Sequence, residues 1–421
     1  MLGPMSKISD LLKAIQSAPE LIDLYSRGLS PEDVRKSIES ALIPFFDHHE
    51  SLRELAVDVL APDYVLLSRL RAQSGVTDSH LRQMLSAYHD AEGIDSDRLF
   101  AFLSDLMPDI RETGNRFWTF INLERDKSRL GLHEMVKETF SNMSDLIEGL
   151  LKTHLVEHVG LARIIHKRAF DLSALRSAKL GVLADELLAH PSYTGLLTTV
   201  PDNLKVPQWR NIAAHQAYRI VDGIVQFKRK MGTNIETVNL LPSELLNRLS
   251  QIVYATQTIS LAHKFFCYDH VHDIRARSPV IARSEHPRDE VWLLFFLTSL
   301  NAIGFYIEDF EFSKERARLV LRDLTNEDPW RRSIHASQLI YQVWYYTESS
   351  RISVEYKVNP LALGFFGGCY DFNQMSWFFR KTLSSIKPKL EGAGYKESKA
   401  GVYDLRDLDA IRDWTREVAR K

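Results

Sequence analysis

The segment from residue 132 to residue 168 constrains the fold most, because its apolar side chains recur at the spacing of an α-helix. A long helix with one apolar face is stable when that face packs against other helices. The segment therefore predicts a mainly α fold built as a helical bundle. The side chains on the expected inner face are Met135, Phe140, Met143, Leu146, Leu150 and Leu151.

Start and stop signals predict further helices on both sides of this segment. Ser30-Pro31-Glu32-Asp33 combines a capping Ser, a Pro at the first helical position and acids in the first turn. Pro44 is expected to end or kink that helix. Other helices are predicted at residues 64–71, 80–88, 98–106 and 172–190, and from Pro242 to about His270.

The C-terminal third of the chain changes character. Residues 305–312 and 317–321 alternate apolar and polar side chains around a short polar turn, which predicts a hairpin. A helix is expected at residues 330–348, a strand at 351–358, a Gly-rich turn at 364–368 and a helix at 373–387. This order predicts a small α+β domain.

We therefore expect three regions: a helical N-terminal region at residues 5–95, a helical domain at 96–274 and an α+β domain at 288–421. Charge and proline concentrate between Arg275 and Pro287, where we place the main boundary. A chain of 421 residues, 45% of them hydrophobic, is long enough for at least two packed cores.

Composition excludes several classes of function. The formal net charge is −2, so any contact with nucleic acid must come from a local patch. The chain has 2 cysteines, which excludes a disulfide framework and suits a reducing cytosol. No apolar run reaches the roughly 18–20 residues of a membrane span. The first residues lack the pattern of a secretory signal, so we expect a cytoplasmic protein without a membrane partner.

The sequence RNIAAH at residues 210–215 carries the chemistry. Arg210 supplies a permanent cation with a planar donor fork for phosphate. His215 can take or give a proton near neutral pH. On one helix, positions five apart differ by about 140° around the axis, so the two side chains converge only near a helix end or across a two-fold axis. This spacing favours a composite site made by two subunits.

The motif resembles the signature of the HEPN family of all-helical ribonucleases. Asn211 follows the Arg, the small pair Ala213-Ala214 precedes the His, and Pro207 marks the start of the helix. The resemblance covers residues 95–270 and implies a bundle of four to five helices. It also implies a dimer with Arg210, His215 and Asn211 as catalytic residues. Members of the family act as toxins, as abortive-infection proteins and as CRISPR-associated effectors.

Such a pair would cleave RNA by attack of the 2′-hydroxyl on the adjacent phosphate. His215 would move the proton and Arg210 would stabilise the charge on the phosphate. The products would carry 2′,3′-cyclic phosphate and 5′-hydroxyl ends, and no metal or cofactor is expected. The expected partners are RNA, a second copy of the chain and an antitoxin or sensor protein.

Nearby residues are weaker candidates for RNA contact. Basic side chains lie at Arg219, Lys228, Arg229 and Lys230, and each is also consistent with an ordinary surface charge. Tyr218 is expected to stack a base, whereas Trp209 is expected to pack in the core.

Two alternatives to a nuclease remain open on sequence alone. The chain could be a non-catalytic HEPN-like scaffold that binds a partner protein, or an unrelated helical protein. Arg82 and His89 fit a looser version of the motif, which shows that such pairs arise by chance. Burial and pairing of both motif side chains inside one subunit would favour the scaffold.

Two further runs contain metal-ligand residue types. Residues 47–50 read Asp-His-His-Glu, and residues 269–273 contain Asp269, His270, His272 and Asp273, with His263 upstream. We interpret the first as a solvated helix end and the second as a polar linker, and expect no metal site. The Gly-rich turn at 364–368 is no phosphate loop, because no Lys-Ser/Thr follows it.

Overall fold

The computed structural model describes residues 19–55, 57–122, 130–231, 234–277, 289–358, 361–365, 369–371, 397–399 and 402–404. The chain forms two compact units. The helical unit comprises Phe45–His48 and the described residues of Arg69–Arg288. The mixed unit comprises the described residues up to Pro44, those of His49–Ser68 and those from Asp289 onward. The described chain is mostly helical, with a small sheet region toward the C-terminus, as predicted.

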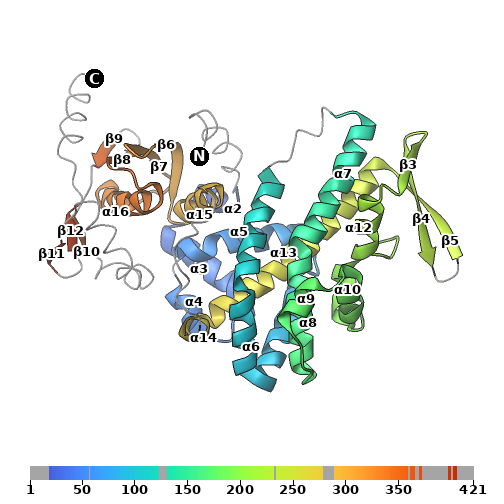
Figure 1. Ribbon diagram of the computed structural model, residues 1–421. Coiled ribbons are helices and arrows are strands. Elements are labelled where there is room, and N and C mark those ends of the chain that lie inside the picture. The colour runs from blue at the N-terminus through green and yellow to red at the C-terminus, as the bar shows by residue number, and fades with distance from the viewer. Residues whose placement is uncertain are drawn as a thin grey trace. The chain divides into compact units, whose positions relative to one another are not determined.

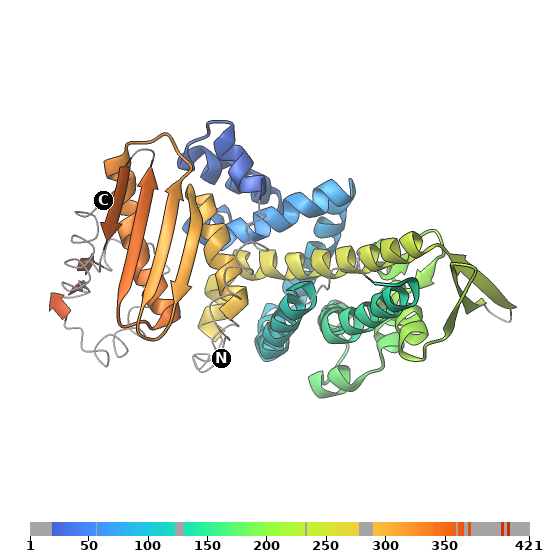
Figure 2. The same ribbon diagram turned by 90° about the horizontal axis from the view of Figure 1, so that it is seen from above.

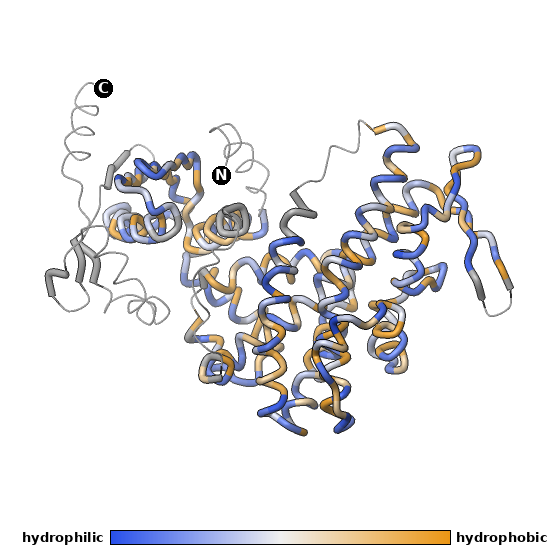
Figure 3. The backbone as a smooth tube through the Cα atoms, in the orientation of Figure 1, coloured by the Kyte–Doolittle hydropathy of each residue, from blue (hydrophilic) through white to orange (hydrophobic). Residues whose placement is uncertain are grey.

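The helical unit is built on four long elements: α6 (Thr77–Asn122), α7 (Leu132–Leu146), α8 (Lys152–Ile165) and α13 (Pro242–Asp269). Helix α6 packs on α8 and α13, and α7 packs on α13 and α12 (Val206–Ala214) (Figure 1). Hydrophobic and hydrophilic residues alternate along these helices, as expected of helices with one buried face (Figure 3). The inner face predicted for residues 132–168 is confirmed at Phe140, Met143, Leu146, Leu150 and Leu151, which are buried.

Shorter elements complete this unit. The predicted helix at 172–190 is divided into α9 (Leu172–Ser177) and α10 (Leu180–Leu188), because Ala178 adopts an extended conformation. The remaining elements are η4 (Pro191–Tyr193), α11 (Thr194–Leu197), β1 (Thr198–Thr199), β2 (Leu204–Lys205) and α14 (Val271–Arg277). Helix α5 (Val57–Gln73) and the turn η1 (Ile43–Phe45) contribute residues to both units.

Helix α6 bends at Asp95, whose backbone is not helical (φ −160°, ψ 84°). The Asp95 side chain accepts a hydrogen bond from the backbone N–H of Arg98 at 3.1 Å, which is the geometry of a helix N-cap. The helices predicted at 80–88 and 98–106 are therefore the two halves of α6. At Gly160 of α8, a Cβ atom would lie 2.2 Å from the ring of Phe102, so this glycine allows α8 to approach α6 closely.

A three-stranded antiparallel sheet follows α12 directly and was not predicted. Its strands are β3 (Tyr218–Val221), β4 (Ile224–Met231) and β5 (Asn234–Leu240). Asp222 and Gly223 join β3 to β4 with φ values of 49° and 80°, as in a type I′ hairpin turn. Residues 96–274 were predicted to form a helical domain, and these strands correct that prediction.

The mixed unit contains a four-stranded sheet in the order β6-β7-β8-β9. Strands β6 (Phe305–Phe312) and β7 (Ala317–Asp323) form the predicted hairpin, and β8 (Ile352–Val358) pairs parallel to β7. Helix α16 (Pro329–Thr347) makes the crossover between β7 and β8, and Figure 2 shows it against one face of the strands. Strand β9 (Leu361–Phe365) pairs antiparallel to β8.

A second small sheet in this unit contains β10 (Cys369–Asp371), β12 (Val402–Asp404) and β11 (Glu397–Lys399). The helix predicted at 373–387 and most of the Gly-rich turn lie outside the described residues.

Helices from the start of the chain also belong to the mixed unit. They are α2 (Pro19–Ser26), α3 (Pro31–Leu42) and α4 (His49–Glu54). Both α2 and α3 contact α15 (Asp289–Ala302), and the Tyr25 hydroxyl donates to the carbonyl of Ala302 at 2.7 Å.

The three regions predicted at 5–95, 96–274 and 288–421 therefore do not coincide with the two units. The apolar faces of α2 and α3 are buried against residues far along the chain, which local sequence does not reveal.

Candidate functional site

The motif lies on α12, a helix of nine residues whose start is confirmed as predicted. Pro207 occupies the first turn, and Gln208 Oε1 accepts a hydrogen bond from the backbone N–H of Lys205 at 2.8 Å. The helix ends at Ala214, so His215 is its C-terminal cap rather than an interior residue. Its backbone N–H donates to the Asn211 carbonyl at 3.1 Å. The motif thus occupies the C-terminal end of α12.

Trp209 fixes the orientation of this helix. The indole is fully buried, and its Nε1–H donates to Thr199 Oγ1 at 2.8 Å. The Phe227 ring packs edge-on at 5.3 Å between centroids. The predicted core role of Trp209 is confirmed, and its packing holds the neighbouring Arg210 in one direction.

Arg210 contacts an acid that the sequence did not reveal. Its Nε lies 2.6 Å from Glu148 Oε1, and the Arg210 side chain keeps 35% exposure. Nε makes no directed hydrogen bond among the described residues, so this contact is an ion pair. Nη1 donates to Asn211 Oδ1 at 3.2 Å. Glu148 and Asn211 together orient the guanidinium at the protein surface.

Glu148 lies in a π-helical turn, η3 (Ile147–Leu151), between α7 and α8. Such single π turns occur often at functional sites, because the extra residue redirects the side chains that follow. Lys152 Nζ lies 3.8 Å from the other Glu148 oxygen. The Glu148–Lys152 spacing is visible in the sequence, but its meeting with Arg210 requires the tertiary fold.

His215 is exposed, and its imidazole makes no hydrogen bond or ion pair within the part of the chain that the structure describes. Arg210 and His215 are not paired with each other there. The Arg210 side chain is therefore held by its contacts and partly buried, whereas the His215 side chain is exposed to solvent. A purely structural motif would instead have both side chains buried and paired.

The candidate RNA-binding side chains differ in their exposure and in whether an acid already pairs with them. Arg219 is exposed, and its Nε donates to Gln226 Oε1 at 3.1 Å, which leaves its charge uncompensated by that contact. Lys228 is also exposed. Arg229 pairs with Glu236 at 2.7 Å and donates to the Asp202 carbonyl. The side chain of Lys230 lies outside the described part.

Tyr218 is in contact with the helical core. Its ring stacks on Phe140 at 4.3 Å between centroids and an interplanar angle of 21°. One face of the ring is therefore covered by α7. Of the weaker RNA-binding candidates, Arg219 and Lys228 retain the most accessible positive charge on β3 and β4.

Sequence reasoning also missed a buried polar cluster between α8 and α13. Glu157 is 0% exposed, with one oxygen 2.5 Å from His263 Nδ1 and the other 3.2 Å from His154 Nδ1. Cys267 Sγ lies 3.5 Å from His263 Nε2. The spacing His154-x-x-Glu157-His158 is the signal that was available, since it also occurs as a metal-ligand motif.

The charged side chains of this cluster form an ion-paired network. Burial alone would lower the pKa of His263, but the neighbouring Cys267 and Glu157 raise it well above its usual value. Burial alone would raise the pKa of Glu157, and the two histidines hold it well below its usual range. Glu157 therefore neutralises a buried cation.

His158 behaves in the opposite way. Its Nδ1 lies 2.8 Å from the Tyr193 hydroxyl, and its Nε2 has no hydrogen-bond partner among the described residues. Burial lowers the pKa of His158 to about 4. The folded protein therefore holds this imidazole neutral at a pH where the unfolded chain is protonated.

This difference predicts an acid-dependent loss of stability. A histidine whose pKa is lowered in the folded state stabilises the folded protein fully above its unfolded pKa of about 6.5. This contribution amounts to about 3 kcal/mol and is lost as the pH falls toward 4. His158→Gln, which can still bond Tyr193, should flatten the fall in unfolding free energy between these pH values. Urea denaturation across that range measures it, with the exposed His133→Gln as control. Parallel pH profiles for wild type and His158→Gln would contradict this assignment.

Comparison with protein-family models, curated proteins and solved structures gave no match to this chain. Function therefore has to be argued from the side chains. Among the described residues, no helix combines the length and apolar character that a membrane crossing requires.

Proposed function

We propose that this chain is a metal-independent endoribonuclease of the HEPN type, which cleaves RNA by attack of the 2′-hydroxyl on the adjacent phosphate. One observation carries the proposal. At the end of α12, Arg210 is oriented by Glu148 at 2.6 Å while the imidazole of His215 is exposed. A fixed cation beside an accessible acid–base group is the minimum that this reaction needs.

Each residue has a distinct role in this proposal. His215 takes the proton from the 2′-hydroxyl or gives one to the departing 5′ oxygen. Arg210 binds the phosphate and stabilises the charge that develops on it. Glu148 and Asn211 engage Nε and Nη1 of Arg210, so its Nη2 donors are the ones directed to the substrate. Asn211 is a positioning residue here.

The site is completed by a second copy of the chain. Within one chain, Arg210 and His215 are not joined, as expected for positions five apart on a helix. A two-fold axis would bring the Arg of one chain to the His of the other. Arg219 and Lys228 would attract the RNA backbone beside this site.

The biological setting that fits such an enzyme is the cytoplasm, in anti-phage defence or a toxin–antitoxin pair with a neutralising or sensing partner. The alternative is a HEPN-like scaffold that binds a partner protein without catalysis. The observation that favours this alternative is the Arg210–Glu148 ion pair, because it satisfies the arginine inside the chain.

The ends formed by RNA cleavage test the proposed reaction. The purified chain is incubated with RNA in EDTA, and with the same RNA carrying one 2′-deoxynucleotide at a mapped cleavage position. We expect cleavage to persist in EDTA, to leave 2′,3′-cyclic phosphate and 5′-hydroxyl ends, and to stop at the deoxy position alone. Products with 3′-hydroxyl ends, or cleavage that continues at the deoxy position, would contradict the proposed reaction.

A further inference from the structure

The two runs of metal-ligand residue types that the sequence places far apart meet in the helical unit. His48 lies in the segment Phe45–His48, and Asp269 and His270 lie between α13 and α14. Phe45 of this segment stacks on Phe265 of α13 at 5.5 Å between centroids, which holds the segment in place. Neither run was expected to bind a metal. The adjacent histidines of the first point about 100° apart on a helix, and the second lacks a second ligand pair with matching spacing.

Helix α6 adds two more ligands at the same place. His89 and Glu92 lie three residues apart on one face of the helix. The Glu92 Oε2 atom lies 3.9 Å from His89 Nδ1 and 3.4 Å from His270 Nε2. His270 is 2% exposed, and its Nε2 makes no hydrogen bond within the described chain. A buried imidazole nitrogen that makes no hydrogen bond among the described residues thus faces the Glu92 carboxylate.

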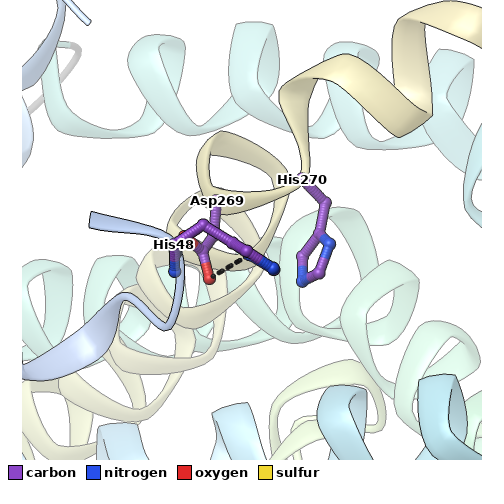
Figure 4. A group of neighbouring side chains, drawn as sticks. All are labelled: His48, Asp269 and His270. Carbon is purple, nitrogen blue, oxygen red and sulfur yellow. Dashed lines mark hydrogen bonds and ion pairs between the residues drawn. The ribbon is translucent and has the colours of Figure 1, made fainter. Parts of the chain in front are cut away.

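Asp269 holds the segment Phe45–His48 in place beside His270. Its two oxygens accept the backbone N–H groups of Asp47 and His48, each at 2.9 Å. Oδ2 also lies 3.3 Å from His48 Nδ1. Figure 4 shows the His48 ring directed toward His270, and the two ring centroids are 4.9 Å apart. A carboxylate behind one nitrogen of a histidine orients the other nitrogen as a ligand.

The separations fit ligands around an ion better than direct hydrogen bonds. Ligand atoms in a tetrahedral Zn²⁺ site lie about 3.3 Å apart, because each bond is about 2.0–2.1 Å long. Hydrogen bonds between such atoms are shorter, at about 2.7–3.2 Å. The ligand atoms of His89, Glu92 and His270 all lie within 4.8 Å of one another, and so do those of His48, Asp269 and His270.

The groups His89, Glu92, His270 and His48, Asp269, His270 share only His270. We propose that His270, His89 and Glu92 bind a divalent transition metal of the Zn²⁺ class, and that His48, oriented by Asp269, moves toward the ion to become the fourth ligand. Three imidazoles and one carboxylate favour Zn²⁺ over Mg²⁺ or Ca²⁺, which prefer oxygen ligands. The metal joins the segment Phe45–His48 to α6 and to the end of α13. Its role is structural, and it is independent of Arg210 and His215.

Metal binding by the full chain tests this site. EDTA-treated protein is titrated with ZnCl₂ by calorimetry, and with CoCl₂ by visible absorption, which reports tetrahedral geometry. We expect one ion per chain and a rise in Tm of about 5–10 °C at a Zn²⁺ concentration about 100-fold above Kd. Asp269→Asn should weaken binding by about 10–100-fold, as expected of a residue that orients a ligand.

Variants of the ligands decide between a metal site and a cluster of ion pairs. His89→Ala and Glu92→Gln should lose the Co²⁺ spectrum, whereas His133→Ala, which removes an exposed imidazole of α7, should keep it. Glu92→Gln preserves side-chain size, so it remains informative if His270→Ala fails to fold. Equal Zn²⁺ binding by Glu92→Gln, His89→Ala and wild type, or no stoichiometric binding at all, would overturn the proposal.

Discussion

Replacement of His215 by Ala is expected to reduce RNA cleavage by about 10²–10⁴-fold, the usual effect of removing a general acid or base. The variant should unfold at the same temperature as the wild type, because His215 is exposed and its imidazole has no partner among the described residues. Loss of activity without loss of stability is the result that separates the nuclease from the scaffold. A gel assay measures RNA cleavage, and calorimetry measures the Tm of each variant.

Arg210→Ala should also abolish cleavage, and a mixture of the two variants tests the composite site. A heterodimer of Arg210→Ala and His215→Ala chains has one intact site if Arg and His come from different chains. Refolding an equal mixture should then restore about one quarter of wild-type activity. No restoration would contradict a site shared between two chains. Growth of cells that express each variant gives the same comparison in vivo.

The largest expected effect on stability comes from Glu157. Glu157→Ala should lower the free energy of unfolding by about 3–5 kcal/mol, because it leaves the charge of His263 buried without its carboxylate partner. His263 has a raised pKa in the folded state, so its stabilising contribution is complete below about pH 6.5 and is lost as the pH rises through the folded value. The loss caused by Glu157→Ala should therefore be largest at or below neutral pH.

Urea denaturation at several pH values measures this effect. The matched control is Glu186→Ala, which breaks the partly exposed ion pair with Arg163 at 2.9 Å and should cost less than about 1 kcal/mol. The double variant Glu157→Leu/His263→Phe should recover part of the stability, since two apolar groups replace a buried pair. Equal losses of unfolding free energy for Glu157→Ala and Glu186→Ala would show that the buried ion pair stabilises the protein no more than the partly exposed one.

Local sequence signals predicted the helices well but read the segment after the motif incorrectly. The starts of α12 and α13 follow from Pro207 and Pro242, and the α16 region follows from its apolar period. The Asp222-Gly223 dipeptide is a strong signal for a hairpin and was available at residues 218–227. A helical domain was instead predicted across these residues.

The missing parts of both sites depend on tertiary contacts. Glu148 and Arg210 lie in different helices, and nothing in the sequence around either predicts their ion pair. His48 was discounted because adjacent histidines diverge on a helix, and His270 because its run lacks a second ligand pair. Helix α6 brings His89 and Glu92 to His270 only after folding. Residue types and spacing selected Arg210 and His215 as candidates, but did not reveal the ion pair between Arg210 and Glu148.

The order of the elements along the chain has a consequence for synthesis on the ribosome. Helices α2 and α3 are made first, yet their partner α15 begins at Asp289, after the whole helical unit. At about 5–20 residues per second, roughly 10–50 s pass before α15 is made. During that time Leu21, Val34 and Ile38, which are fully buried in the finished protein, have no α15 to cover them. A nascent chain of this design is a natural client for a chaperone that binds early helices.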